Sequence, residues 1–259
     1  VVAVRPTAAG DQHDRFAPLT FAGGPLVVPS VSVAGGGAPL ADGEPVAVTG
    51  TGFAPHERLF LRQCLAGGDC DATGRARAVQ ADGSGGFTTD MLVFHDVGLG
   101  LDTAGPLVRW QPCAPCELRV DRQGWSGHSA AAVALAPTAT PIRPGIALAP
   151  AGPYQPGQRV RVEGHGFQPP VDGPDDVPPL VLAWCRTGGT ADECLQPSVD
   201  APVVDADGGF VVEGVPLPGA DVVLFGVTCA EVPGGCSLAW RDSQLGAALG
   251  QQVPLDLSG

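Results

Sequence analysis

The chain has 259 residues, a net charge of −13, no Lys, and Arg residues that stand singly rather than in clusters. This length suits two domains of about 100 to 150 residues each. Without a basic stripe to meet phosphates, nucleic acid and anionic membranes are disfavoured as partners. No apolar run reaches the roughly 18 residues of a membrane span, so membrane insertion is not expected.

The first 27 residues are too few for a domain of their own. Val2-Ala3-Val4-Arg5 followed by Phe16 to Ala22 resembles Leu118 to Asp121 followed by Ala130 to Ala136. We predict an N-terminal β-hairpin that looks like the end of a preceding repeat. Three interpretations stay open: the end of an earlier unit in a longer array, a strand pair that completes another protomer in trans, or an ordinary extension.

The rest of the chain is an internal repeat. Val46 to Phe53 matches Val160 to Phe167, and Leu59 to Cys64 matches Leu180 to Cys185. Two further pairs follow in the same order: Ala81-Asp82-Gly83 with Ala206-Asp207-Gly208, and Cys113 and Cys116 with Cys229 and Cys236. A repeat of this length predicts two domains of one kind, at residues 28–137 and 138–259.

Each repeat shows short runs of alternating apolar residues, separated by Gly and Pro turns, and no long helical period. This spacing is typical of a β-sandwich. We therefore predict an all-β protein of two tandem immunoglobulin-like seven-stranded β-sandwiches, preceded by the hairpin. The expected strands are 29–34, 45–50, 58–64, 76–81, 86–94, 107–120 and 129–136, then 145–149, 158–164, 179–186, 199–204, 209–215, 222–240 and 247–257.

Eight Cys residues are divided evenly between the repeats. Four thiolates per domain could bind zinc, and Cys113-Ala114-Pro115-Cys116 has the spacing of a redox motif. Between the repeats, however, the first gap grows from five intervening residues to eight and the second from two to six. A disulfide loop tolerates such growth, whereas paired zinc knuckles do not, so disulfides formed in an oxidising compartment are favoured. The protein is expected to be secreted or to lie on the cell surface.

Several motifs of each repeat occur in the order of a known family. They are Asp42-Gly43, Gly50-x-Gly52-Phe53, Gln63-Cys64 with Cys70, Ala81-Asp82-x-x-Gly85, and the later pair Cys113 and Cys116. The repeat resembles the neocarzinostatin family of secreted actinobacterial immunoglobulin-like sandwiches, some of which carry an enediyne chromophore in a cleft. The resemblance implies the disulfides Cys64 to Cys70, Cys113 to Cys116, Cys185 to Cys194 and Cys229 to Cys236.

The resemblance fails where a chromophore would bind. Members that bind one carry an aromatic residue two positions after the first strand Cys, where this chain has Ala66 and Thr187. They also carry a Phe three residues before the Val of the strand that leads to the Ala-Asp turn, where Ala76 and Ala201 stand here. Without these rings a flat ligand has no surface on which to stack.

Signals for catalysis and metal binding are weak. The five His residues are never two or four positions apart, and Gly124 to His128 differs from a nucleophile elbow in its second Gly and in its hairpin setting. The acidic loop with Asp172, Asp175 and Asp176 could hold Ca²⁺, although most such loops are simply hydrated. No enzyme activity, cofactor or catalytic residue is predicted.

We expect an extracellular structural or interaction protein that joins copies of itself or another cell-surface protein, with assembly through the N-terminal hairpin. The alternative is a carrier of a small hydrophobic ligand in a sandwich cleft. Core packing is expected for three of the four Trp residues, with Trp184 against its disulfide. The candidate contact residues are Trp125, Trp110, Phe16 and Phe21.

Overall fold

The computed structural model describes residues 2–4, 15–17, 27–35, 38–73, 75–100, 108–122, 128–169, 180–189, 191–196, 199–242 and 249–257. Within these ranges the chain is all-β, apart from one turn of 3-10 helix at Ala191–Glu193. This confirms the predicted fold class. No helix in the described part of the chain is long and apolar enough to cross a membrane.

The N-terminal strands β1 (Val2–Val4) and β2 (Arg15–Ala17) pair with each other in antiparallel fashion, as the predicted hairpin requires.

Sandwich 1 packs a three-stranded sheet of order β3-β4-β7 against a four-stranded sheet of order β11-β10-β5-β6. Its core includes Val46 and Val48 from one sheet and Leu61, Leu118 and Val120 from the other. Because side chains alternate across a strand, every second residue is buried from Val46 to Gly50 and from Cys116 to Val120. The strands are β3 (Ser30–Val33), β4 (Glu44–Thr51), β5 (Arg58–Leu65), β6 (Arg77–Gln80), β7 (Phe87–Val93), β10 (Cys116–Arg122) and β11 (His128–Val133).

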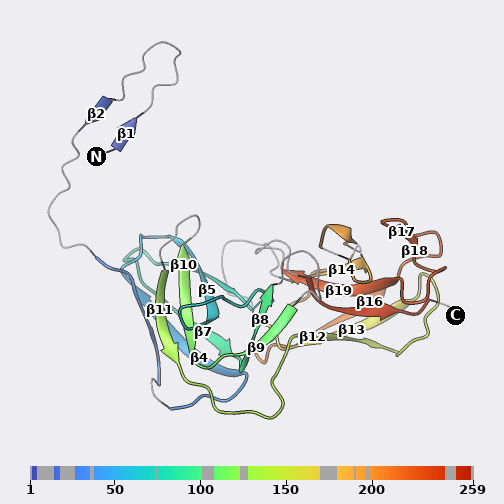
Figure 1. Cartoon of the computed structure of the whole chain (residues 1–259), viewed down its shortest axis with the longest axis horizontal. Coiled ribbons are helices and arrows are strands. Elements are labelled where there is room, and N and C mark those ends of the chain that lie inside the picture. The colour runs from blue at the N-terminus through green and yellow to red at the C-terminus, as the bar shows by residue number, and fades with distance from the viewer. Residues whose placement is uncertain are drawn as a thin grey trace.

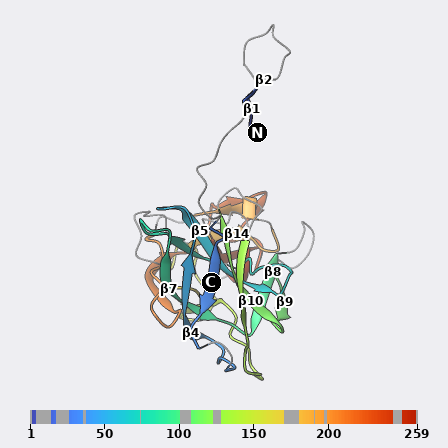
Figure 2. The ribbon, with the colours of Figure 1, turned by 90° about the vertical axis from the view of Figure 1, so that its left-hand side faces the viewer.

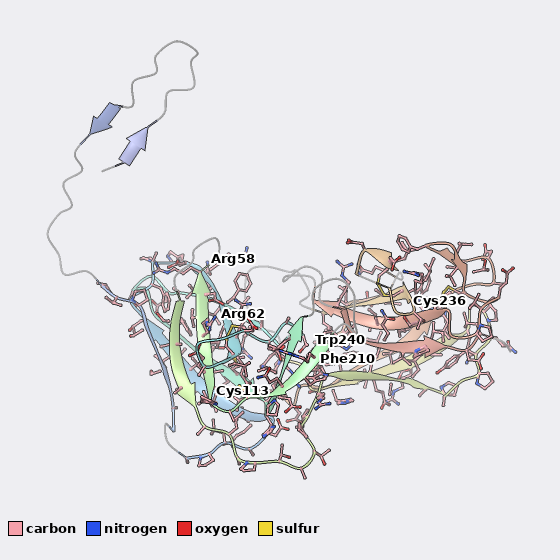
Figure 3. All side chains as sticks on the ribbon, in the orientation of Figure 1. Arg58, Arg62, Cys113, Phe210, Cys236 and Trp240 are labelled. Atoms are coloured by element: carbon pink, nitrogen blue, oxygen red, sulfur yellow. A yellow bond between two sulfur atoms is a disulfide. The ribbon has the colours of Figure 1, made fainter. Side chains whose placement is uncertain are left out.

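Sandwich 2 repeats this plan with sheets of order β12-β13-β16 and β15-β14-β19-β20. Its core contains Trp240, which packs edge-on against Phe167 at 4.9 Å between ring centroids. Figure 3 shows Trp240 and Phe210 in the part of sandwich 2 that lies nearer to sandwich 1. The strands are β12 (Gly145–Ala149), β13 (Arg159–His165), β14 (Leu180–Arg186), β15 (Cys194–Leu195), β16 (Phe210–Pro216), β19 (Cys236–Asp242) and β20 (Leu249–Leu255).

Each sandwich carries an extra hairpin. In the chain it follows the last strand of the three-stranded sheet and precedes the second disulfide. In sandwich 1 the hairpin is β8 (Asp96–Gly100) with β9 (Val108–Pro112), and in sandwich 2 it is the shorter β17 (Val223–Leu224) with β18 (Val227–Thr228). Figure 1 shows β8 and β9 where the two sandwiches meet, and β17 and β18 in the part of sandwich 2 away from sandwich 1. In Figure 2, which faces sandwich 1, sandwich 2 lies behind it, so the two are stacked end to end.

These hairpins correct the predicted strands. The stretch expected as one strand at 107–120 is two strands, β9 and β10, and the stretch expected as one strand at 222–240 is three, β17, β18 and β19. Strand β8 was not predicted. Pro112 and Pro115 lack an N–H group and cannot donate a hydrogen bond to a neighbouring strand. The strand expected at 107–120 is therefore interrupted between β9 and β10. Residues 199–204 form no strand because Pro202 cannot donate to a sheet, and β15 pairs with β14 at that edge instead.

The repeat alignment also needs one correction at the turn before β7 and β16. The carboxylate of Asp82 accepts bonds from the backbone N–H groups of Ser84 and Gly86. The residue that does the same in sandwich 2 is Asp205, not the predicted Asp207. The predicted match lies two residues too late, because the second repeat holds an additional Asp, Asp207, in this turn.

Candidate functional site at the junction of the two sandwiches

Arg75 is the centre of the contact between the sandwiches. Its side chain is only 1% exposed, which is rare for Arg. Nε donates to the carbonyl oxygen of Gly166 at 3.0 Å, and Nη2 donates to that of Ile142 at 2.7 Å. Nη1 donates to the carbonyl oxygen of Asp96 at 3.0 Å. One guanidinium therefore binds the backbone of sandwich 1, the linker, and the turn after β13 in sandwich 2.

The guanidinium lies among aromatic rings and carboxylates. Its carbon is 3.6 Å from the ring centroid of Phe94 and 5.4 Å from that of Trp110, both within cation–π distance. Burial lowers the pKa of Arg75 to about 10, against the opposing pull of nearby carboxylates, chiefly that of Asp71. Arg75 thus stays charged at neutral pH. Since burying it costs more than these carboxylates offset, its contribution is a fixed geometry rather than surplus stability.

An ion pair joins the linker to sandwich 1. Arg143, just before β12, donates from Nε and Nη2 to one carboxylate oxygen of Asp96, at 3.0 and 2.7 Å. The other oxygen lies 3.0 Å from Nδ1 of His95. The side chain of Asp96 is 3% exposed. Burial alone would raise the pKa of Asp96, but the hydrogen bonds with His95 and Arg143 prevail and lower it. Asp96 is therefore a buried anion held by sandwich 1 and the linker together.

Asp42 ties the linker to the same end of sandwich 1. One of its oxygens accepts the N–H of Ile142 at 2.6 Å, and the other accepts the N–H of His95 at 2.8 Å. With Arg75 bound to the Ile142 carbonyl, both backbone groups of Ile142 are held by side chains of sandwich 1. The linker is therefore fixed as firmly as a residue in a sheet.

Two Gln side chains bond backbone groups at the end of β7. Gln168 of sandwich 2 accepts the N–H of Leu92 at 3.0 Å and donates to the Leu92 carbonyl. Gln63 on β5 does the same for Phe94, with the N–H of Phe94 at 2.8 Å from its amide oxygen. Each buried amide thus completes a backbone residue as a neighbouring strand would. Gln168 is the one that does so across the junction.

Gly43 marks the closest apolar contact between linker and sandwich 1. Its φ is 78°, and a Cβ built on it would lie 3.0 Å from Cδ1 of Ile142. Its counterpart Gly157 has φ 76° and open space around such a Cβ. We expect Gly157→Ala to cost about 1 kcal/mol from backbone strain alone, and Gly43→Ala to cost about 1 kcal/mol more because Ile142 must move. Calorimetry on both variants checks this, and equal losses would contradict the contact.

A groove of about 740 Å³ lies on sandwich 2, away from the junction contacts, between β13, β16 and the segment before the Asp205 turn. It is lined by Arg159, Val199, Asp200, Ala201, Val203, Val211, Val212, Glu213 and Gly214. Ala201 is where chromophore-binding members of the resembled family carry a Phe. None of the lining residues is aromatic, so the groove offers charge but no stacking surface.

The Trp and Phe residues predicted as contacts lie in different parts of the chain. Trp110 is half-buried in the junction, 5.4 Å from the guanidinium carbons of both Arg75 and Arg143. Trp240 is fully buried, whereas Trp184 is half-buried and donates to the carbonyl of Pro216 at 3.1 Å. Phe16 is in β2, but its side chain lies outside the described residues. Also outside them are Phe21, Trp125, Ser126, Asp172, Asp175 and Asp176.

The structure contains four disulfides: Cys64–Cys70, Cys113–Cys116, Cys185–Cys194 and Cys229–Cys236. They are the pairs that the family resemblance implies. Within the described residues no three His, Cys, Asp or Glu side chains gather as metal ligands would.

No protein-family model and no curated protein matches the chain. Among solved structures, macromomycin aligns over its whole length with 42% of this chain, at 23% identity and a TM-score of 0.36. Apokedarcidin aligns over 98% of its length with 42% of this chain, at 28% identity and a TM-score of 0.33. Both are neocarzinostatin-family chromoproteins. A tetra-tandem repeat from the extending region of a large adhesion protein aligns over 49% of its length with 88% of this chain, at 13% identity and a TM-score of 0.24.

Proposed function

We propose that this chain is an extracellular structural or interaction module, in which two neocarzinostatin-like immunoglobulin sandwiches form one rigid unit. The observation that supports this is the buried Arg75 at the junction. Contacts between the domains of one chain normally leave them free to move. A guanidinium that is 1% exposed and bonded to Gly166 and Ile142 restricts both bending and twisting at this joint.

Four disulfides favour an oxidising compartment, in agreement with a role outside the cell. The residue composition, with 38 Gly, 27 Pro and no Lys or Asn, fits the GC-rich genome of an actinobacterium. We propose that the N-terminal hairpin of β1 and β2 also joins units, since a two-stranded ribbon has two free edges. Light scattering on the chain with and without residues 1–27 tests this part, and equal masses would argue against it.

The alternative is a carrier of a small hydrophobic ligand. The groove on sandwich 2 is the candidate cleft, but Arg159, Asp200 and Glu213 make it polar. In sandwich 1, the buried side chain of Arg75 stacks on Trp110 and Phe94 where an aromatic ligand would need open rings. The described surfaces therefore favour the structural role.

The test is to measure residual dipolar couplings of backbone amides in both sandwiches, and to titrate the same sample with the apolar dye 8-anilinonaphthalene-1-sulfonate. A rigid module gives one alignment tensor for both sandwiches and no saturable dye binding. Two different tensors would overturn the rigid unit. Saturable binding with one dye per chain, lost in Ala201→Arg, would instead support the carrier.

A further inference from the structure

The two sandwiches are copies of one plan stacked in the same direction, so each has two different end faces. We call the end that carries the extra hairpin and the turn before β4 or β13 the downstream face. We call the end that carries the turn before β7 or β16 the upstream face. The junction joins the downstream face of sandwich 1 to the upstream face of sandwich 2 (Figure 1). Within the described residues, the upstream face of sandwich 1 and the downstream face of sandwich 2 meet no other sandwich, and we call them the unused halves of the same kind of joint.

The unused downstream face preserves the local shape of the used one. Gly43 and Gly157 occupy the same turn, with φ of 78° and 76°. In both turns the side chain that follows accepts a backbone N–H three residues earlier, at 2.7 Å for Glu44 and 2.9 Å for Gln158. Gly43 meets Cδ1 of Ile142, whereas the space over Gly157 is open. Sandwich 2 thus has open space at Gly157, at the position that Ile142 occupies beside Gly43 in sandwich 1.

The unused upstream face carries Val27, the residue equivalent to Ile142, which could occupy the open space over Gly157. Ile142 stands two residues before Pro144, and Val27 stands two residues before Pro29. A Cβ on Gly166 would meet the Arg143 carbonyl, and one on its counterpart Gly52 would meet Val27 and the Val28 carbonyl. The two segments therefore run over equivalent glycines. Val27 is 71% exposed and Val28 is 78% exposed.

The chemistry of the two unused faces changes together. In the junction, Arg143 binds Asp96, the first residue of β8. At the unused faces the residue equivalent to Arg143 is Val28, and the first residue of β17 is Val223. The residue that replaces Arg143 and the start of the hairpin that replaces β8 are therefore both apolar, so the two unused faces match each other in character. Phe225 at the hairpin tip and Val232 beside it, 52% and 47% exposed, enlarge the apolar area.

We propose that the downstream face of sandwich 2 docks on the upstream face of sandwich 1 in a second copy of this chain, and so repeats the interior junction in apolar form. The internal repeat identifies a second copy as the partner of these faces. In the described structure, the partner that contacts a face of this kind is another sandwich of the same plan. The contact is heterologous, so each added copy leaves one face of each kind free and copies join head to tail. The proposal rests on the proposed function, since it needs a rigid unit to propagate direction.

The test uses sedimentation velocity on the full chain between about 1 µM and 1 mM, where weak protein contacts become visible. We expect the wild type to form concentration-dependent species longer than a dimer. Val28→Asp and Phe225→Asp should each raise the concentration needed at least tenfold. Val211→Asp is the matched control, because Val211 is also 52% exposed but lies on the flank of β16. Circular dichroism confirms that each variant is folded.

Mixing the two end variants distinguishes a head-to-tail contact from any other. Val28→Asp keeps its downstream face and Phe225→Asp keeps its upstream face, so an equimolar mixture should form dimers that grow no further. A wild type that stays monomeric at 1 mM, or a mixture that stays monomeric while the wild type assembles, would overturn the proposal. Neither result would change the alignment tensors or the dye titration, so the proposed function is tested separately.

Discussion

Arg75→Met is expected to separate the two sandwiches and to destabilise the chain by about 3 to 5 kcal/mol. The substitution keeps most of the side-chain volume but removes three donors and one buried charge. The carbonyl oxygens of Gly166, Ile142 and Asp96 then lose a partner inside the junction, and the carboxylate of Asp71 loses its nearest cation. Breaking a buried ion network on one side costs this much because the remaining charge stays desolvated.

The measurement is calorimetry combined with residual dipolar couplings on the variant. A single thermal transition should split in two, and the common alignment tensor should become two tensors. Arg109→Met is the control, because Arg109 lies exposed on β9, in the hairpin beside the junction, and its side chain donates to Gln111 at 3.5 Å rather than to a group of the junction. Its effect should stay within about 0.5 kcal/mol. An Arg75 variant that keeps one tensor would show that the contacts of Gln168, Asp42 and Asp96 are enough to fix the joint.

Arg75→Lys separates charge from geometry at the same position. Lysine keeps a positive charge but offers a point-like ammonium, which cannot reach three carbonyl groups that lie in different directions. Burial also lowers the pKa of a lysine more readily than that of an arginine. A loss close to that of Arg75→Met would therefore show that the fork of donors, rather than the charge, holds the joint.

The sandwiches were predictable because their signals are local. Alternating apolar residues, as in Val46 and Val48, place every second side chain in a core, and regular turns set the strand count. The hairpin strand β8 was not predicted from the sequence because Gly98 and Gly100 weaken the pattern of a strand. Gly98 is nevertheless required, since a Cβ there would lie 2.2 Å from Cγ2 of Thr73 and 3.0 Å from Trp110. That crowding is tertiary and leaves no mark on the local sequence.

The contacts of the junction were not predicted from the sequence for a similar reason. Arg75 reads as one of several single Arg residues, and a chain alone does not show that three carbonyls will converge on it. One signal was available, however. Aligning the repeats places Gln168 opposite Ala54 and Asp42 opposite Pro156, so polar residues occur on one copy where the other has none. Such differences between equivalent positions mark where two otherwise identical units perform different contacts.

The linker alone does not explain a fixed joint. Pro141 and Pro144 stiffen the backbone between the sandwiches, but prolines restrict only their own φ and leave the neighbouring torsions free. Asp42 and Arg75 remove that freedom by holding both backbone groups of Ile142. Rigidity therefore depends on ionised side chains, and it should respond to pH.

Acid is expected to loosen the junction through Asp96. Its pKa in the folded chain is lowered by the hydrogen bonds with His95 and Arg143, which outweigh the effect of burial. A carboxyl group with a lowered folded pKa contributes stability above its unfolded pKa of about 3.9 and loses it as pH falls through the folded value. Protonated Asp96 can no longer pair with Arg143, so the joint should weaken below about pH 4.

Asp96→Asn isolates this contribution, because the amide keeps the shape of the carboxyl group without its charge. At pH 6 we expect the variant to be about 1.5 to 3 kcal/mol less stable, the range for hydrogen bonds to charged groups. The difference should shrink as pH falls, since the wild type loses the same charge by protonation. Hydrogen exchange at the amide of Ile142, measured at pH 6, 4 and 2.5, reads the joint directly. A gap that stays constant across this range would assign the acid response to another carboxylate.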